Sequence, residues 1–195
     1  MRLVLASQSP RRAAVLSALG LEFVVATPEV DEARRPDEEP HAYVERVARE
    51  KAVAVASSGD VVVAADTVVV HGGRIMGKPG HPEEARAMLR KLQGDKHDVV
   101  TGLAVAGYDS GPILHSAVDV TEVSFLSMTE DEIVGYVATG EPMDKAGAYA
   151  LQGVGGLYVE WVKGSPFTVI GLPVHLLPRM LGRLGHSIEA FRRFD

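Results

Sequence analysis

Short apolar runs alternate along this chain with segments whose apolar residues recur every three or four positions. The β-branched run Val61-Val62-Val63-Ala64-Ala65 predicts a buried strand, and residues 3–6 predict a shorter one. Helical periodicity is found over residues 10–20, 41–56 and 82–92, with proline opening the first and third of these segments. This alternation constrains the fold most, because it favours an α/β architecture and excludes disordered and coiled-coil classes.

The remainder of the chain continues the mixed pattern without internal repeats. Two long strands are expected over residues 98–106 and 114–125, joined by a turn at 109–112. Thr129 and Glu132 have the spacing of a capping box, which predicts a helix start. The other expected elements are a strand at 23–26, a hairpin over 68–76, strands at 157–162 and 168–171, and helices from 173 and over 188–194. We therefore expect a mixed sheet.

Length and charge narrow the classes of function. The 195 residues fit one compact domain over 1–195 or two small lobes, with the acidic, proline-punctuated stretch 28–40 as a boundary or lid. The net charge of -6 argues against a nucleic-acid polymer as partner, because such binders need a broad basic face. The absence of cysteine excludes disulfides, thiolate nucleophiles and zinc ribbons. No apolar run approaches the ~20 residues that span a bilayer, so no membrane partner is expected.

The start of the first predicted helix gathers cations and hydroxyls. Arg11 and Arg12 fall in its first turn, where the helix dipole makes positive charge unfavourable. Ser7 and Ser9, the expected helix cap, bring hydroxyls to the same place, where backbone N–H groups have no partner within the helix. A bound phosphate would resolve this conflict. The alternative is that both arginines extend into solvent or pair with the acidic loop.

Two further charged side chains stand in apolar surroundings. Lys51 lies four residues after Val47, on the apolar stripe of the helix expected over 41–56. Its ammonium either snorkels to solvent or lies in a cleft where it would bind a phosphate. Asp66 directly follows the buried run, at the carboxyl end of the expected strand, where open α/β sheets bind ligands. It is either a turn aspartate that caps its own backbone or a general base or metal ligand. Asp31 or Glu32 of the acidic loop would supply a second carboxylate.

One glycine-rich segment imitates a phosphate-binding P-loop without being one. Gly72, Gly77 and Lys78 have the required spacing, but the next residue is Pro79 instead of the serine or threonine that binds magnesium. Lys78 remains a candidate cation on a loop. The chain also lacks HExxH and GxSxG motifs, which removes support for zinc proteases and serine hydrolases.

Five blocks together resemble the Maf family of nucleoside triphosphate pyrophosphatases. They occur in the family's order and cover nearly the whole chain: Leu5-Ala6-Ser7-Gln8-Ser9-Pro10-Arg11-Arg12, Ala64-Ala65-Asp66-Thr67-Val68-Val69, Gly77-Lys78-Pro79, Met143-Asp144-Lys145-Ala146-Gly147-Ala148-Tyr149 and Gly171-Leu172-Pro173. Residues 147–153 are similar to the branch that acts on dTTP and UTP. Pro166 departs from the pattern expected for its loop.

The resemblance implies a two-lobed fold like that of the inosine triphosphate pyrophosphatases, with a cleft between the lobes and a possible homodimer. It implies a nucleoside triphosphate substrate, cleaved to the monophosphate and pyrophosphate with a divalent cation, Mg or Mn, and a possible action on modified nucleotides. By matching position, Asp66 is the expected proton acceptor, beside Lys51 and Lys78 as catalytic cations, and Glu32 joins Asp66 at the metal. The expected substrate-binding residues are Ser7, Arg11, Arg12, Thr67 and Gln152, of which the last three match specificity positions.

A different class of function is also consistent with the resemblance. A nucleotide-binding regulator of cell division, acting in septum formation, would need the phosphate cradle but no catalytic base. The presence of Asp66 favours turnover over this alternative. The expected location is cytoplasmic.

Overall fold

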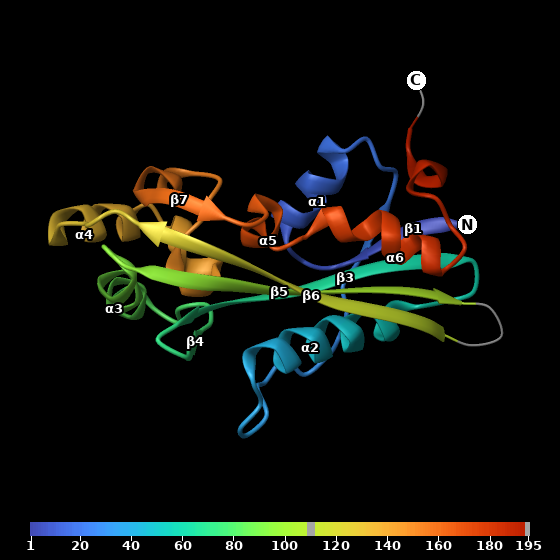
Figure 1. Ribbon diagram of the computed structural model, residues 1–195, viewed down its shortest axis with the longest axis horizontal. Helices are drawn as coiled ribbons and strands as arrows, with labels where there is room; N and C mark the ends of the chain where they lie inside the picture. The colour runs from blue at the N-terminus through green and yellow to red at the C-terminus, as the bar shows by residue number, and fades with distance from the viewer. Residues whose placement is uncertain (109–111, 194–195) are drawn as a thin grey trace. The chain divides into compact units, whose positions relative to one another are not determined.

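A computed structural model describes residues 1–108 and 112–193 of this chain. Within these residues seven strands form one mixed sheet in the order β2-β1-β3-β5-β6-β7, with β4 paired to β3 (Figure 1). The strands are β1 (Arg2–Ala6), β2 (Val24–Ala26), β3 (Asp60–His71), β4 (Arg74–Met76), β5 (Lys96–Tyr108), β6 (Pro112–Phe125) and β7 (Val159–Lys163). The α-helices are α1 (Pro10–Ala18), α2 (Pro40–Val55), α3 (Pro82–Leu92), α4 (Glu130–Ala138), α5 (Pro166–Ile170) and α6 (Leu177–Arg183). The expected mixed α/β class is confirmed.

Short 3₁₀ segments fill the connections of the carboxyl-terminal half. They are η1 (Glu141–Asp144), η2 (Ala146–Ala148), η3 (Val154–Tyr158), η4 (Val174–Leu176) and η5 (Ile188–Phe191). None of the helices within the described ranges combines the length and apolar character that a bilayer span requires.

The chain divides into two compact units. The first unit consists of Met1–Asp66, Thr101–Asp119 and Gly171–Asp195, and the second of Thr67–Val100 and Val120–Ile170. Strands β3, β5 and β6 each contribute residues to both units. A single domain with a cleft between two lobes stays a prediction.

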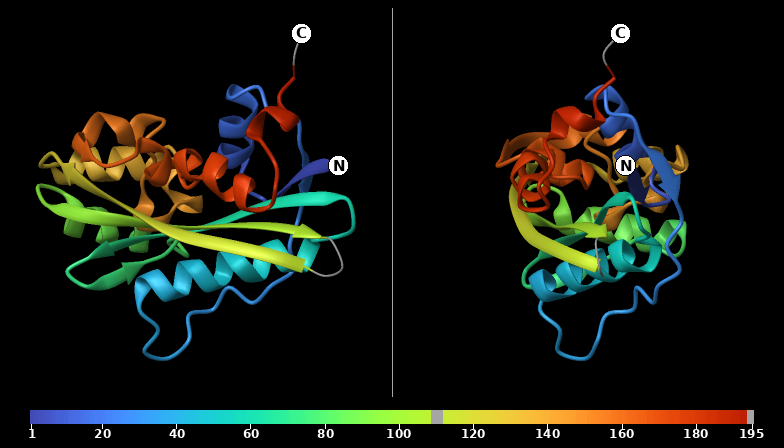
Figure 2. Two further views of the ribbon diagram at one scale, coloured as in Figure 1. Left: turned by 45° about the vertical axis from the view of Figure 1, so that its right-hand side comes forward. Right: turned by 90° about the vertical axis from the view of Figure 1, so that its right-hand side faces the viewer.

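Helix α2 covers one face of the sheet in the first unit (Figures 1 and 2). Strand β1 pairs in parallel with both β2 and β3, and alternate residues of β1, β3 and β5 form a cluster with Ala48 and Ala52 of α2. The helix packs closely at Gly102 of β5, where a Cβ atom would lie 2.3 Å from the carbonyl oxygen of Val44. Small side chains thus let α2 approach the sheet directly.

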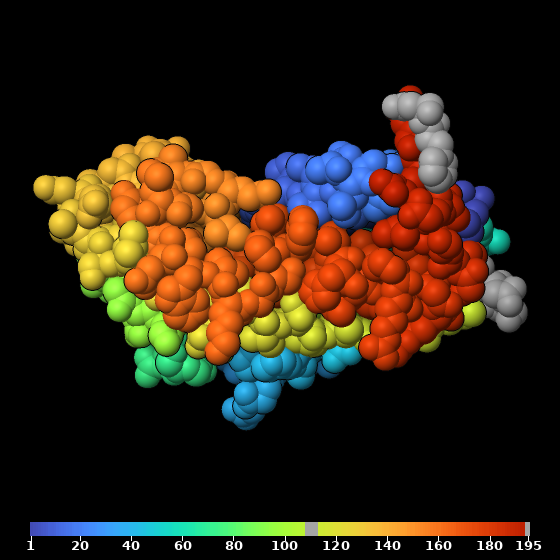
Figure 3. Space-filling view, turned by 45° about the horizontal axis from the view of Figure 1, so that its top comes forward, coloured from blue at the N-terminus to red at the C-terminus, as the bar shows by residue number. Residues whose placement is uncertain are grey.

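Helices α1 and α6 cover the opposite face of the first unit's sheet (Figures 1 and 2). They bury Val15 and Leu16 of α1 and Leu177 and Leu181 of α6. The carboxyl-terminal segment lies beside the end of α1, where Leu21 and Arg192 form an antiparallel bridge, and the two segments meet on the surface in Figure 3. This contact ties the carboxyl-terminal segment to the segment that follows α1.

The second unit has its own apolar core, formed by α3, α4 and strand residues that include Val99, Val123 and Phe125. The expected hairpin is present, since His71 pairs with Arg74 across the turn between β3 and β4. The expected capping box is also present: Thr129 accepts the N–H of Glu132, whose carboxylate accepts the N–H of Thr129.

Several expectations differ from the structure or fall outside it. The helix expected over 188–194 is the short 3₁₀ segment η5, which ends at Phe191, and residue 194 lies outside the described part of the chain. Residues 166–170 form the helical turn α5, where a strand was expected from residue 168, because Pro166 presets the first helical φ and Gly171 ends the segment. Strand β3 does not end at Asp66 but continues to His71. The expected turn at 109–112 includes 109–111, which lie outside the described residues.

Candidate active site

A buried lysine joins two carboxylates in the first unit. The Nζ atom of Lys51 lies 2.9 Å from Oδ1 of Asp66 and 3.0 Å from Oε2 of Glu32. The side chains of Lys51 and Asp66 are 7% and 11% exposed, whereas that of Glu32 is 52% exposed. A helix, a strand and a loop therefore contribute to one charged cluster that solvent reaches through Glu32.

The periodicity of α2 places Lys51 in this cluster. Val44, Val47, Ala48 and Ala52 are the helix's other buried residues, so Lys51 faces the sheet with them. A buried ammonium is costly unless it is paired, and Asp66 provides the partner. The snorkelling alternative is therefore wrong for Lys51.

The position of Asp66 follows from strand alternation and from the length of β1. The parallel pairing of β1 with β3 ends at Ala6 and Ala64, so Asp66 stands two residues beyond the end of β1. Asp66 shares the face of Val62 and Ala64 that packs on α2, which turns its carboxylate towards Lys51. The turn-aspartate alternative is wrong, because β3 runs straight through this residue.

Ser7 and Arg12 form a second group of contacts in the same unit. Ser7 is buried, and its Oγ accepts the N–H of Ser9 at 3.1 Å and an N–H of Arg12 at 3.3 Å. Arg12 Nε also donates to the carbonyl oxygen of Gly171 at 2.7 Å. Ser9 occupies the N-cap position of α1, but within the described residues its hydroxyl makes no capping hydrogen bond.

Electrostatic interactions link Arg12 to the charged cluster. Burial lowers the pKa of Arg12, the negative charges of Asp66 and Glu32 oppose this shift, and the positive charge of Arg11 adds to it. Arg11 and Arg12 are both partly buried. The structure therefore brings Ser7, Arg12, Glu32, Lys51 and Asp66 together, and the alternative of two solvent-extended arginines is wrong for Arg12.

The sequence model of the family described as "Maf-like protein" matches residues 2–184. This chain belongs to the Maf-like family. A dTTP/UTP pyrophosphatase of Anaeromyxobacter dehalogenans (strain 2CP-C) is 52% identical over 188 residues, which cover 96% of each chain. A relative of the same name from Geobacter sulfurreducens is 47% identical over 94% of this chain and 97% of its own. Among solved structures, the Ham1 protein of Staphylococcus aureus gives a TM-score of 0.42 at 18% identity, over 78% of this chain and 88% of that one.

The three other predicted residues of this Maf-like chain belong to the second unit. Thr67 is partly buried in β3, directly after Asp66. Lys78 is exposed on a loop that is anchored where Gly77 accepts the N–H of Gly147 at 3.1 Å. Gln152 is exposed, and among residues 1–108 and 112–193 its amide has no hydrogen-bond partner. That these three join the site of the first unit stays a prediction.

Two residues that hold the acidic loop were missed at the level of sequence. Tyr43 Oη donates to the carbonyl oxygen of Glu32 at 2.8 Å, and Arg46 pairs with Glu38 at 2.7 Å while donating to the loop carbonyl of Ala33 at 3.0 Å. Burial raises the pKa of Tyr43 to about 12, and the charges of the nearby carboxylates add to the shift. A signal was available, because Tyr43 stands eight residues before the buried lysine of α2 and so lies on the same helix face.

The carboxylates of Glu32 and Asp66 suit a divalent cation. Among the described residues no group of three His, Asp or Glu side chains gathers as a closed metal site. Magnesium commonly uses only one or two carboxylates, together with waters and substrate phosphates. Both carboxylates contact the same ammonium of Lys51, so they lie close to each other. Their oxygen atoms and their proximity fit such a cation.

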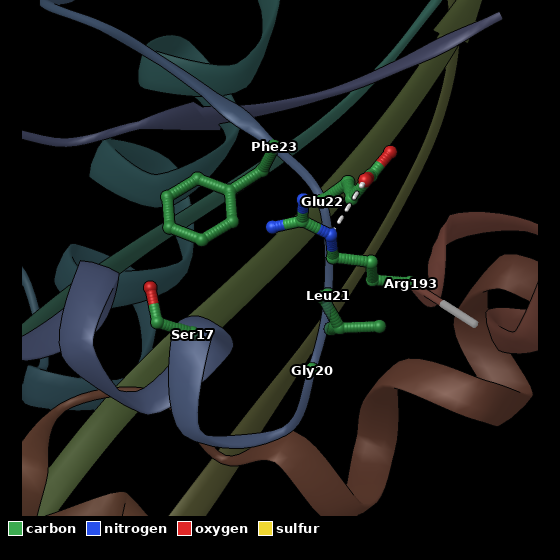
Figure 4. Close-up of a pocket in the computed structure, with 6 residues that line it drawn as sticks. All are labelled: Ser17, Gly20, Leu21, Glu22, Phe23 and Arg193. Atoms are coloured by element: carbon green, nitrogen blue, oxygen red, sulfur yellow. Dashed lines mark ion pairs between the residues drawn. The ribbon is translucent and has the colours of Figure 1, made fainter. Parts of the chain in front are cut away.

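A separate pocket of about 510 Å³ lies at the end of α1 (Figure 4). Its walls carry an ion pair of 3.8 Å between Arg193 and Glu22. It is lined by Ser17, Gly20, Leu21, Glu22, Phe23 and Arg193. Within the described part of the chain, none of the predicted site residues lines this pocket.

Proposed function

We propose that this Maf-like chain hydrolyses dTTP and UTP to the monophosphate and pyrophosphate. Relatives named dTTP/UTP pyrophosphatase support this proposal, since they are up to 52% identical along nearly the whole chain. The observation that carries it is the buried contact of Asp66 with Lys51, next to the arginine charge of α1. A nucleotide-binding regulator without turnover would not need this buried carboxylate. The names of the relatives do not favour such a regulator.

Asp66 is the residue we assign to proton transfer. A water attacks the α-phosphorus, the bond from that phosphorus to the bridging oxygen breaks, and pyrophosphate leaves with the electron pair. Lys51 binds Oδ1 of Asp66 at 2.9 Å and so orients the carboxylate. Oδ2 is then the atom that takes the proton of the attacking water.

The cations and hydroxyls of the first unit hold the phosphates in this proposal. Ser7, Arg11, Arg12 and the first-turn N–H groups of α1 meet the phosphate oxygens, as expected at a helix start. Lys51 and Lys78 supply further positive charge. Positive charge at several places orients the triphosphate so that the α-phosphorus faces the carboxylate.

Glu32 and Asp66 are the residues that would hold a divalent cation, Mg²⁺ or Mn²⁺. When bound, it neutralises charge on the phosphates and on the departing pyrophosphate. Arg12, Thr67 and Gln152 are the positions we assign to substrate choice. A cytoplasmic location, a homodimer and a role in removing modified nucleotides remain parts of the proposal that follow from the family alone.

Product analysis tests the proposed function. The purified chain is incubated with dTTP, UTP, CTP, the purine triphosphates and modified analogues, with Mg²⁺, with Mn²⁺ and with a chelator, and the products are separated by chromatography. We expect monophosphate and pyrophosphate from dTTP and UTP, only with a cation present. Accumulation of a nucleoside diphosphate would rule the mechanism out. Light scattering of the eluted protein reports the oligomeric state.

A further inference from the structure

The phenol of Tyr136 holds the chain just before Gln152. Its Oη accepts the N–H of Ala150 at 3.1 Å, in a buried contact, and donates to Oε1 of Glu141 at 2.7 Å. The residue is 2% exposed. A buried tyrosine whose hydroxyl both donates and accepts is fixed in orientation, so the backbone that it binds is fixed with it.

The carboxylate of Glu141 holds the chain just after Gln152. Oε2 accepts the N–H of Val154 at 3.0 Å, and Oε1 accepts the N–H of Gly155 at 3.0 Å. Together with the bond from Tyr136, one carboxylate therefore accepts three hydrogen bonds. The backbone is thus tied two residues before Gln152 and again two and three residues after it.

The glycines of this loop show that its backbone packs directly on the Tyr136–Glu141 pair. A Cβ atom at Gly153, whose φ is +146°, would lie 2.2 Å from Oε2 of Glu141. A Cβ atom at Gly155 would lie 2.4 Å from the hydroxyl of Tyr136. Side chains at either position would push the loop off the pair, so glycine is required for this close approach.

The electrostatics of Glu141 suit a permanent anchor. Burial raises the pKa of its carboxyl group, but the bonds from Gly155, Tyr136 and Val154 lower it more, so the pKa lies below the ordinary range. The carboxylate therefore stays ionised near neutral pH and keeps accepting. The N–H groups of Val154 and Gly155 are thus satisfied by Glu141 and not by the amide of Gln152.

We infer that Tyr136 and Glu141 are positioning residues that hold Gln152 at a fixed place, from which its exposed amide reads the base. This rests on the proposed function. Uracil and thymine present an N3–H donor beside the O4 acceptor, and one amide answers both. Cytosine reverses the pattern, so rejecting it requires that the amide meets the base at one place, and this in turn requires a backbone that cannot shift.

A double-mutant cycle tests the inference with Glu141→Gln and Gln152→Ala. The amide that replaces the carboxylate turns a donor towards backbone N–H groups, so we expect the ratio of kcat/KM for dTTP over CTP to fall by about tenfold. Gln152→Ala should lower the same ratio, and the double variant should fall no further than Gln152→Ala alone, because one residue acts through the other. Glu160→Gln is the matched control, since it neutralises another carboxylate of the second unit and should leave the ratio unchanged.

Amide hydrogen exchange without nucleotide gives a readout besides activity. Residues 150–156 should exchange faster in Glu141→Gln than in the parent chain or in Glu160→Gln. If Glu141→Gln fails to fold, Tyr136→Phe takes its place, because it keeps the ring and removes only the hydroxyl. If the parent chain is active and the variant keeps the parent's dTTP to CTP ratio, the inference is overturned but the proposed function is not. Additive effects in the double variant have the same consequence. A parent chain that releases no pyrophosphate from dTTP overturns the proposed function as well.

Discussion

Asp66 is buried and pairs with the cation of Lys51, and from this pairing we predict the effect of replacing it. Its Oδ1 atom lies 2.9 Å from Lys51 Nζ, so Asp66→Asn keeps the shape but loses the proton-accepting lone pairs and the charge. We expect turnover to fall by about 10²–10⁴-fold while the fold and nucleotide binding are kept, with a lower thermal midpoint because Lys51 loses its buried charged partner. Steady-state kinetics, calorimetry and nucleotide titration measure the three quantities.

The matched control for Asp66 lies in the same strand. Asp60 is also buried, but its carboxylate accepts two hydrogen bonds from Arg2, at 2.9 and 2.8 Å, and takes no part in the proposed site. Asp60→Asn should therefore lower stability and leave kcat unchanged. Near-native turnover in Asp66→Asn would refute the assignment of Asp66 as the base.

His97 is a buried titratable residue in the second unit. It is 3% exposed, its Nε2 lies 2.8 Å from the hydroxyl of Tyr149, and its Nδ1 has no hydrogen-bond partner among the described residues. Burial lowers its pKa from 6.5 to about 4, the charge of His71 adds to the shift, and Asp95 opposes it. The folded state therefore favours the neutral imidazole.

This shift of the His97 pKa predicts a pH dependence of stability. Between about pH 6.5 and about 4 the unfolded chain binds the proton and the folded chain does not, so stability falls as the pH is lowered through this window. The slope from this one residue reaches at most about 1.4 kcal/mol per pH unit. Denaturant unfolding of the parent chain and of His97→Gln, followed across this range, should show a shallower slope in the variant. Parallel slopes would contradict the prediction.

At the scale of elements, α2 carries both Lys51 and the anchors of the acidic loop. Arg46 binds Glu38 and the loop carbonyl of Ala33, so Arg46→Met should free the loop that presents Glu32. We expect the Mg²⁺ concentration for half-maximal activity to rise by about tenfold, the usual effect of losing support behind a metal ligand. Arg49→Met is the control, because Arg49 is exposed on the same helix and donates to Ser116. If the two variants require the same Mg²⁺ concentration, the anchoring of the loop by Arg46 does not support cation binding.

The contact of α2 with β5 sets a second prediction for this helix. A Cβ atom at Gly102 would lie 2.3 Å from the backbone oxygen of Val44. Relieving this clash requires a shift of the backbone of the strand or of the helix. Gly102→Ala should destabilise the chain by about 1–3 kcal/mol, as overpacked cores do. At Gly107 of the same strand, a Cβ atom would be 3.4 Å from the flexible side chain of Leu184, so Gly107→Ala should change stability far less. Thermal midpoints compare the two variants, and equal midpoints would contradict the close approach.

At the scale of the whole molecule, turnover and folding should respond differently to metal removal. Lys51 already pairs with both Asp66 and Glu32, so without an ion the buried carboxylate keeps a cationic partner and the second carboxylate, that of the half-exposed Glu32, is solvated. Chelation should abolish pyrophosphate release while lowering the thermal midpoint by no more than about 3 °C. Calorimetry and activity on the same samples decide the point, and a large loss of stability would make the ion structural.

The sequence by itself determined most elements of this chain and the residue types of its proposed site. Apolar periodicity located the strands and most helices, and the conflict of two arginines in the first turn of α1 pointed to the proposed anion site without any structure. Boundaries failed where local signals were ambiguous: the β-branched residues 168–170 read as a strand, although Pro166 starts a helical turn there.

Only the tertiary structure decided how the charged residues are paired. Whether Lys51 snorkels or is buried depends on the strand that α2 covers, and the register of β1 with β3 places Asp66 beneath the helix. The anchors Tyr43, Arg46, Tyr136 and Glu141 were missed for the same reason. Each of them bonds at least one backbone atom, and no pattern of side chains in a sequence records which backbone N–H or carbonyl group a fold will bring near.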